Sequence, residues 1–214
     1  MNLTFSQREI RDLAVAWVAL GVAFSLLLEP QLRSVLFGQL GTLTVPGIVQ
    51  TLVVSLLTVG VAFLLHELAH KVVAVRFGQI AAFRADYRML GFAVVGALVG
   101  FLFAAPGAVV HRGRITAKEN GLIALAGPVT NLLLAALFLG PFAFVSLTGT
   151  GGFLSDLAYR GLQINLLLAG FNMLPFGPLD GRKVRTWSTA IWAAVAVPSI
   201  LLAVAALLVL PLFT

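Results

Sequence analysis

The sequence predicts an all-α, polytopic membrane protein with about five to six transmembrane helices and a small membrane-embedded β or re-entrant region. Of its 214 residues, 60% are hydrophobic and only 10% are charged, whereas a soluble domain carries about 25% charged residues. Several apolar runs also reach the roughly 20 residues that a helix needs to cross a bilayer. So few charges cannot solvate the surface of a compact soluble protein, and we expect a lipid bilayer to surround the chain.

The first two apolar runs predict two long helices. The N-terminal span covers residues 13–28 and is closed by Glu29 and Pro30. It lacks a convincing small-residue cleavage site, so we interpret it as a retained helix and not as a signal peptide. The second run begins at Pro46 and continues to about Phe77. Its roughly 30 residues exceed the thickness of the hydrocarbon core, so this helix must tilt or protrude.

Residues 79–115 are expected to form the re-entrant or β region. The apolar stretch 92–105 is short for a membrane span, and a hairpin-like segment follows at 108–116. Non-helical backbone at membrane depth is tolerated only where protein buries it or where it lines a wet cavity.

Three further spans are expected at about 117–147, 154–174 and 187–210. Thr116 and Glu119 form a helix-capping signature in front of the first of them. Pro198 lies inside the last one and is expected to kink it.

The distribution of Lys and Arg distinguishes five spans from six. If residues 92–105 cross the membrane, seven of the 14 basic residues lie on each side, which gives no orientation signal. If they do not cross, 12 lie on the N-terminal side and 2 on the other. The positive-inside rule then places the N-terminus in the cytoplasm. Because aromatic side chains do not interleave with these basic residues, we expect anionic lipid and no nucleic acid as their partner.

His66-Glu67-Leu68-Ala69-His70, inside the second apolar run, is the strongest chemical signal. Histidines at positions i and i+4 share one helix face. Both imidazoles can therefore reach one zinc ion, and Glu67 can act as the general base. Ionisable residues inside a membrane helix are costly and indicate function by default. The alternative is a buried polar cluster that only packs helices.

A catalytic zinc ion commonly has three protein ligands, and the chain contains no cysteine. The third ligand must therefore be His111 or a carboxylate. Asp180 is the best candidate, because the prolines and glycines before it predict irregular backbone that can turn a carboxylate into a cavity. Five spans also bring it to the same membrane side as the histidine pair. The alternatives are an Asp180 that only caps a helix or pairs with Arg182, and a His111 that lies in a solvated hairpin.

Three motifs in order carry a family resemblance. The His66–His70 motif, then Gly127-Pro128-Val129-Thr130-Asn131, then the segment from Asn172 to Gly181 with its Pro-Leu-Asp-Gly ending, resemble the site-2 protease family of intramembrane zinc metalloproteases. The chain is most similar to the short archaeal and bacterial members without a PDZ domain, and the match covers roughly residues 50–186. The resemblance implies one Zn²⁺ and hydrolysis of peptide bonds within transmembrane segments of membrane-anchored substrates.

The resemblance also implies roles for individual residues. The implied zinc ligands are His66, His70 and Asp180. Asn172 matches a residue that helps to bind substrate or to stabilise the oxyanion, beside Glu67 as the base. Asn131 would be a structural or substrate-contact residue. Residues 1–214 would then form a single transmembrane protease domain in the cell membrane, with its core at 46–186 and its active-site opening toward the cytoplasm.

Two other functions are weighed against this one. A membrane zinc protease of the type that cleaves prenylated or misfolded proteins recruits a glutamate as third ligand, and Glu119 is the only later glutamate. A metal transporter or a catalytically inactive membrane scaffold comes from a different class. A transporter would carry polar residues along several spans, and a scaffold would be expected to have lost Glu67. The substrate's identity and the oligomeric state stay open.

Overall fold

The computed structural model describes residues 3–36, 38, 44–101 and 106–210. Its helices are α1 (Gln7–Leu28), α2 (Pro30–Leu36), α3 (Val45–Ser55), α4 (Val61–Arg76), α5 (Tyr87–Leu98), α6 (Ala117–Thr148), α7 (Phe153–Asn172), α8 (Asp180–Trp187) and α9 (Thr189–Val209). A π-helical turn, Leu56–Gly60, joins α3 to α4. The strands are β1 (Ile80–Ala85) and β2 (Gly107–Arg112). The fold is therefore mostly helical with a small two-stranded sheet, as the sequence predicts.

Four helical segments among the described residues are long and apolar enough to cross a membrane: Gln7–Leu28, Val45–Arg76, Ala117–Thr148 and Thr189–Val209. The second joins α3, the π-helical turn and α4 into one helix of 32 residues. At 1.5 Å per residue it is about 48 Å long, which exceeds the hydrocarbon core as expected. These helices identify the chain as a membrane protein.

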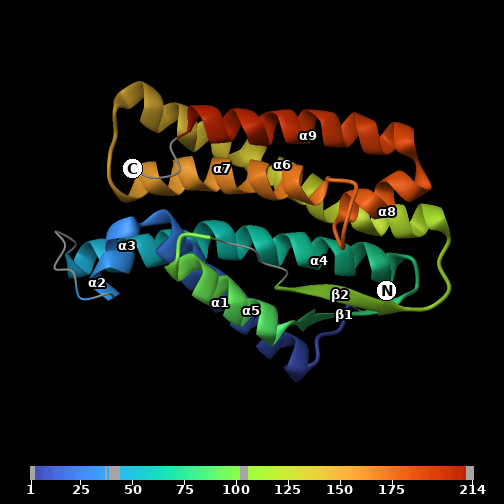
Figure 1. Ribbon diagram of the computed structural model, residues 1–214. Coiled ribbons are helices and arrows are strands. Elements are labelled where there is room, and N and C mark those ends of the chain that lie inside the picture. The colour runs from blue at the N-terminus through green and yellow to red at the C-terminus, as the bar shows by residue number, and fades with distance from the viewer. Residues whose placement is uncertain (1–2, 37, 39–43, 102–105, 211–214) are drawn as a thin grey trace.

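Helix α7 also has span length but is less apolar than these four. Its 20 residues correspond to about 30 Å, yet it carries Asp156, Arg160, Gln163 and Asn165. The last two are buried, because α7 packs against both α6 and α9 (Figure 1). Protein therefore covers part of the polar surface that lipid would disfavour. Helix α7 corresponds to the expected 154–174 span, but it is not among the four described helices that are long and apolar enough to cross a membrane.

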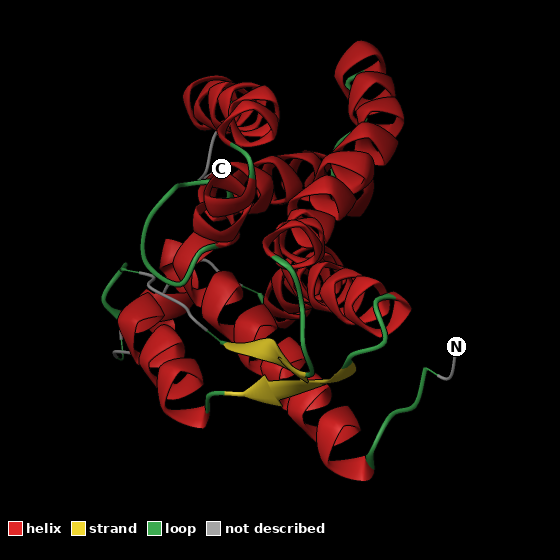
Figure 2. Ribbon diagram, turned by 90° about the vertical axis from the view of Figure 1, so that its right-hand side faces the viewer, coloured by secondary structure: helices red, strands yellow, loops and turns green. Residues whose placement is uncertain are grey.

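The two strands form an antiparallel pair in which Ala85 lies opposite Gly107. The chain between them, which includes α5, therefore leaves the sheet and returns to the same place. Helix α5 packs along α1 (Figure 1). The expected short element 92–105 is helical to Leu98, and its residues 102–105 lie outside the described part of the chain. Figure 2 shows the two strands lying side by side among the helices.

A buried ion pair attaches α1 to α4 and to the sheet. Lys71 Nζ lies 2.7 Å from both carboxylate oxygens of Glu9, and both residues are 1% exposed. Glu9 Oε1 also accepts a hydrogen bond from the Phe83 N–H of β1 at 3.0 Å. This pairing holds the outer edge of β1 against α1.

The chain repeatedly returns to one end of the molecule. The start of α1, the end of α4, the sheet, the start of α6 and the whole of α8 all lie at that end (Figure 1). Asp180, the first residue of α8, is thereby brought beside the C-terminal half of α4.

Candidate metal centre

His66 and His70 lie one turn apart on the same face of α4. Their ring centroids are 4.6 Å apart, and the residues are only 4% and 7% exposed. The i, i+4 spacing in the sequence thus produces the paired imidazoles that it predicts.

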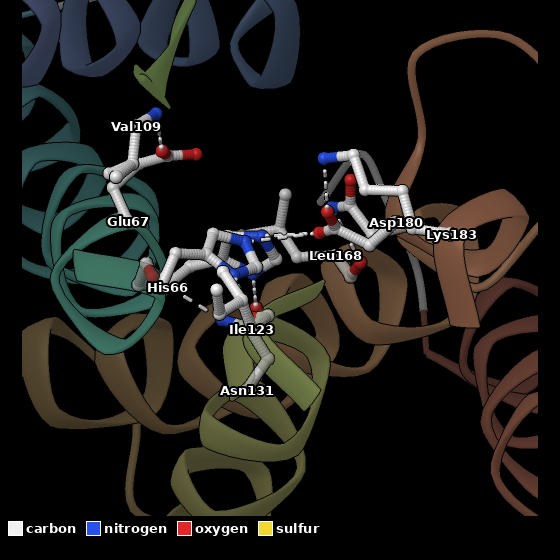
Figure 3. A network of polar contacts seen from close by, with 11 residues as sticks. His66, Glu67, Val109, Ile123, Asn131, Leu168, Asp180 and Lys183 are labelled. Carbon is white, nitrogen blue, oxygen red and sulfur yellow. Dashed lines mark hydrogen bonds and ion pairs between the residues drawn. The ribbon is translucent and has the colours of Figure 1, made fainter. Parts of the chain in front are cut away.

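The Asp180 carboxylate reaches both imidazoles from the start of α8 (Figure 3). Its Oδ2 lies 3.2 Å from His66 Nε2 and 3.1 Å from His70 Nε2. One possible ligand atom from each of the three residues lies within 4.8 Å of the others. Two imidazole nitrogens and a carboxylate oxygen are a donor set that catalytic zinc uses. The structure therefore holds a buried group that can bind one metal ion.

Hydrogen bonds on the far side of each ring leave both Nε2 atoms free for a metal. His70 Nδ1 donates to the Ile123 carbonyl at 2.7 Å, and His66 Nδ1 lies 2.6 Å from Asn131 Oδ1. Because these oxygens accept, each Nδ1 atom carries a proton, and each Nε2 atom faces Asp180, where it can offer its lone pair to a metal ion. A histidine oriented in this way is typical of zinc ligands.

Gly127 on α6 supplies the space for this arrangement. A Cβ atom at this position would lie 2.6 Å from His70 Nε2 and still closer to His66 Nε2. The absence of a side chain at Gly127 therefore leaves the imidazole nitrogens room, which is a second sign that the residues fit a metal ion.

Comparison with known proteins agrees with this donor set. The chain is 41% identical over 199 residues to "Putative zinc metalloprotease MJ0611" of Methanocaldococcus jannaschii, covering 92% of this chain and 93% of that protein. It is 36% identical to "Putative zinc metalloprotease YwhC" of Bacillus subtilis, over 65% of this chain and 67% of the relative. "Putative zinc metalloprotease Rip3" of Mycobacterium tuberculosis is 37% identical over 59% of this chain and 28% of the relative. No protein-family model and no solved structure matches.

The chain belongs to the site-2 protease family of zinc metalloproteases. The relatives' names and the buried group of His66, His70 and Asp180 together support a single Zn²⁺ as the cofactor of this family member.

Glu67 lies next to the first histidine of this site-2 protease and points into the same cavity (Figure 3). It is 7% exposed, and its Oε2 accepts a hydrogen bond from the Val109 N–H of β2 at 3.1 Å. The β element predicted at residues 79–115 thus orients the predicted base.

The cavity that contains the site has a volume of about 570 Å³. Its walls come from α1, α4, β2, α6, α7 and α8 and are mostly apolar. The polar groups gather where α4 meets α8. A cavity in which a few polar groups converge within an apolar wall is typical of a ligand-binding or catalytic site.

The two asparagines that the family motifs single out lie in different surroundings. Asn172, at the end of α7, lines the cavity, and its Nδ2 donates to the Leu168 carbonyl at 3.0 Å. Asn131 is fully buried behind His66. Its burial favours the structural role over the substrate-contact role expected from the sequence.

The second oxygen of Asp180 is held by Lys183 and not by Arg182. Lys183 Nζ lies 3.3 Å from Oδ1. The loop before Asp180 is fixed by a hydrogen bond from Trp192 Nε1 to the Met173 carbonyl at 2.9 Å.

The other candidate ligands lie away from the metal group. His111 on β2 lines the cavity, where burial and the positive charge of Lys183 lower its pKa. Glu119 caps α6, as its Oε2 accepts from the Thr116 N–H at 2.7 Å in the predicted capping box. This bond weakens the alternative in which Glu119 serves as the third ligand.

Sequence reasoning missed Asn165 and the Glu9–Lys71 pair. Asn165 donates and accepts hydrogen bonds behind Asn131. A polar residue in the middle of an apolar run was the available signal for it, since such residues are costly in a membrane. The Glu9–Lys71 pair depends on a contact between distant segments, which no local pattern shows.

Proposed function

We propose that this protein is an intramembrane zinc metalloprotease that hydrolyses peptide bonds within transmembrane segments of membrane-anchored substrates. One observation carries the proposal. His66, His70 and Asp180 converge beside Glu67 in a largely apolar cavity, and the histidines lie on a helix long enough to cross a membrane. The proposed catalytic domain includes a core at residues 46–186, which contains all of these groups.

In this mechanism His66 Nε2, His70 Nε2 and Asp180 hold the zinc ion. When bound, zinc supplies a Lewis acid that polarises the scissile carbonyl and lowers the pKa of water. Glu67 accepts a proton from the attacking water and returns it to the leaving amine. The hydrogen bond from Val109 keeps the Glu67 carboxylate directed into the cavity.

Asn172 is the proposed oxyanion and substrate contact. It lines the cavity, and its Nδ2 donates to a carbonyl of its own helix. A rotation of the side chain would let the amide donate to a substrate carbonyl oxygen in the transition state.

A substrate helix must unwind before attack, because its carbonyls are occupied by its own hydrogen bonds. Strand addition would hold the unwound segment, and β2 offers the open edge. Phe83 and Val109 face each other across the sheet. The outer edge of β1 lies against α1, where the Phe83 N–H donates to Glu9, whereas the outer edge of β2 borders the cavity, where the Val109 N–H donates to Glu67. A substrate strand would therefore pair with β2 beside the base.

The charge distribution supports a cytoplasmic orientation of the site in the cell membrane. Most of the basic residues lie on the start of α1, the end of α4, the sheet, the start of α6 and α8, and these parts of the chain share one end of the molecule (Figure 1). The positive-inside rule places such an end in the cytoplasm. A metal transporter would need polar groups along a path through the spans, whereas this cavity is mostly apolar.

Glu67→Gln tests the proposal. Loss of a general base lowers turnover by about 10²–10⁴-fold, while the three zinc ligands stay in place. We expect the purified variant to keep its zinc and to lose cleavage of a membrane-embedded peptide substrate. Glu119→Gln, the same change at the cap of α6, should cleave normally. Unchanged cleavage by the Glu67 variant, or activity that survives zinc chelation, would contradict the assignment.

A further inference from the structure

Behind His66, buried amides from two other helices form a continuous chain of hydrogen bonds. Asn165 Nδ2 on α7 donates to the Gly161 carbonyl at 2.8 Å. Asn165 Oδ1 accepts from Asn131 Nδ2 on α6 at 3.0 Å, and Asn131 Oδ1 lies 2.6 Å from His66 Nδ1. Asn131 and Asn165 are 0% and 1% exposed, so water does not compete for these bonds.

Each bond in the chain has only one possible direction. The Gly161 carbonyl can only accept, so Asn165 must turn its Nδ2 toward it and its Oδ1 toward Asn131. Asn131 must then donate from Nδ2, which also reaches the Ala62 carbonyl at the longer distance of 3.3 Å. Its Oδ1 is left to face His66, which has to donate from Nδ1. With this proton on Nδ1, the Nε2 atom of His66 is the nitrogen that can offer a lone pair to a metal ion.

We propose that Asn165 is a positioning residue of the metal centre. Acting through Asn131, it fixes the His66 imidazole with a proton on Nδ1 and a free Nε2 facing Asp180. The inference rests on the proposed function, because it requires His66 to be a zinc ligand. Partners that orient a metal-binding histidine typically change metal affinity by about 10–100-fold when they are removed.

Asn165→Leu tests this role with little other damage. The Gly161 carbonyl keeps its backbone donor within α7, and Asn131 Nδ2 keeps the Ala62 carbonyl. The matched control is Gln163→Leu, two positions away on the same helix. Gln163 is also a buried amide, but its Nε2 donates to the Leu210 carbonyl of the α9 end at 3.0 Å. If leucine prevents folding, Asn165→Ala and Gln163→Ala repeat the comparison without added bulk.

The chain has three histidines, so protein labelled with ¹⁵N-histidine gives few imidazole signals. In the zinc-loaded wild type we expect the His66 Nδ1–H proton far downfield and protected from exchange with water. In Asn165→Leu it should move upfield and exchange faster, and zinc should dissociate about tenfold more readily in a competition titration. Gln163→Leu should leave the signal and the affinity unchanged.

The outcomes distinguish a failure of the inference about Asn165 from a failure of the proposed function. If Asn165→Leu and Gln163→Leu behave alike, Asn165 only packs α7, and the inference is overturned while the zinc ligands stand. If the wild-type His66 signals do not respond to zinc at all, the proposed function itself fails.

Discussion

At the scale of single residues, Asp180 is the ligand that the fold brings from farthest away, 114 positions along the chain from His66. Asp180→Ala removes one of three donors, and we expect the zinc content of the purified protein to fall well below one ion per chain. Asp156→Ala is the matched control, since Asp156 Oδ2 binds Gln50 Nε2 between α7 and α3 at 2.8 Å. Atomic absorption measures both. Full zinc occupancy in the Asp180 variant would remove it from the ligand set.

Gly127 provides a residue-scale test that alters no ligand. Its Cβ would lie 2.6 Å from His70 Nε2, so Gly127→Ala must displace the imidazoles, and we expect zinc to bind at least about tenfold more weakly. A Cβ atom added at Gly140, on the same helix, would meet nothing within 4 Å. Gly140→Ala should therefore bind zinc normally. Equal zinc affinities in the two variants would show that zinc binding does not depend on the space beside Gly127.

The site residues differ in how far the sequence predicts them. His66, Glu67 and His70 lie within one turn, so helix periodicity alone predicts that the imidazoles face one another. Asp180 could be chosen only because prolines and glycines precede it and because five spans return the chain to the same end. Asn165 lies on α7 and contacts Asn131 on α6. The spacing of residues within α7 gives no sign of this contact.

At the scale of elements, the Glu9–Lys71 pair joins α1, α4 and β1. Lys71→Met leaves a buried carboxylate without its partner, and we expect the free energy of unfolding to fall by about 3–5 kcal/mol. The double variant Glu9→Gln/Lys71→Met should recover much of this loss, since Gln can still accept from Phe83. Arg11→Met removes a 66%-exposed charge and should cost less than about 1 kcal/mol. Denaturant titration in detergent micelles compares them, and equal losses for Lys71→Met and Arg11→Met would show that the buried pair contributes little.

The elements were predictable where the signal was local. The end of α1 before Glu29 and the capping box at Thr116 follow from short patterns that need no tertiary contact. For the strands, the sequence predicted only a β or re-entrant region at residues 79–115 and not the bounds of β1 and β2. Such a segment, buried by other helices, has no clear periodicity of its own. Helix α7 is less apolar than a lipid-exposed span, because α6 and α9 cover its polar residues.

At the scale of the whole molecule, the number of crossings decides whether Asp180 can meet the histidines. Because Ala85 and Gly107 are paired, the segment between the strands begins and ends at the sheet. We therefore propose that it adds no crossing to those made by the helices. An odd number of spans then puts the chain's start and α8 on the same side, which is the arrangement in which the metal group forms.

The chain's lack of cysteine allows a direct test of this topology. Thr4→Cys and Thr189→Cys place single thiols at exposed positions near the starts of α1 and α9, and Gly151→Cys places one in the loop after α6. In intact cells, a membrane-impermeant maleimide should label only the thiol at position 151, and the other two should react after permeabilisation. This outcome follows from five spans with the 12-to-2 charge bias facing the cytoplasm. Labelling of positions 4 and 189 from opposite sides would indicate an even number of spans, and labelling of both from outside would reverse the orientation.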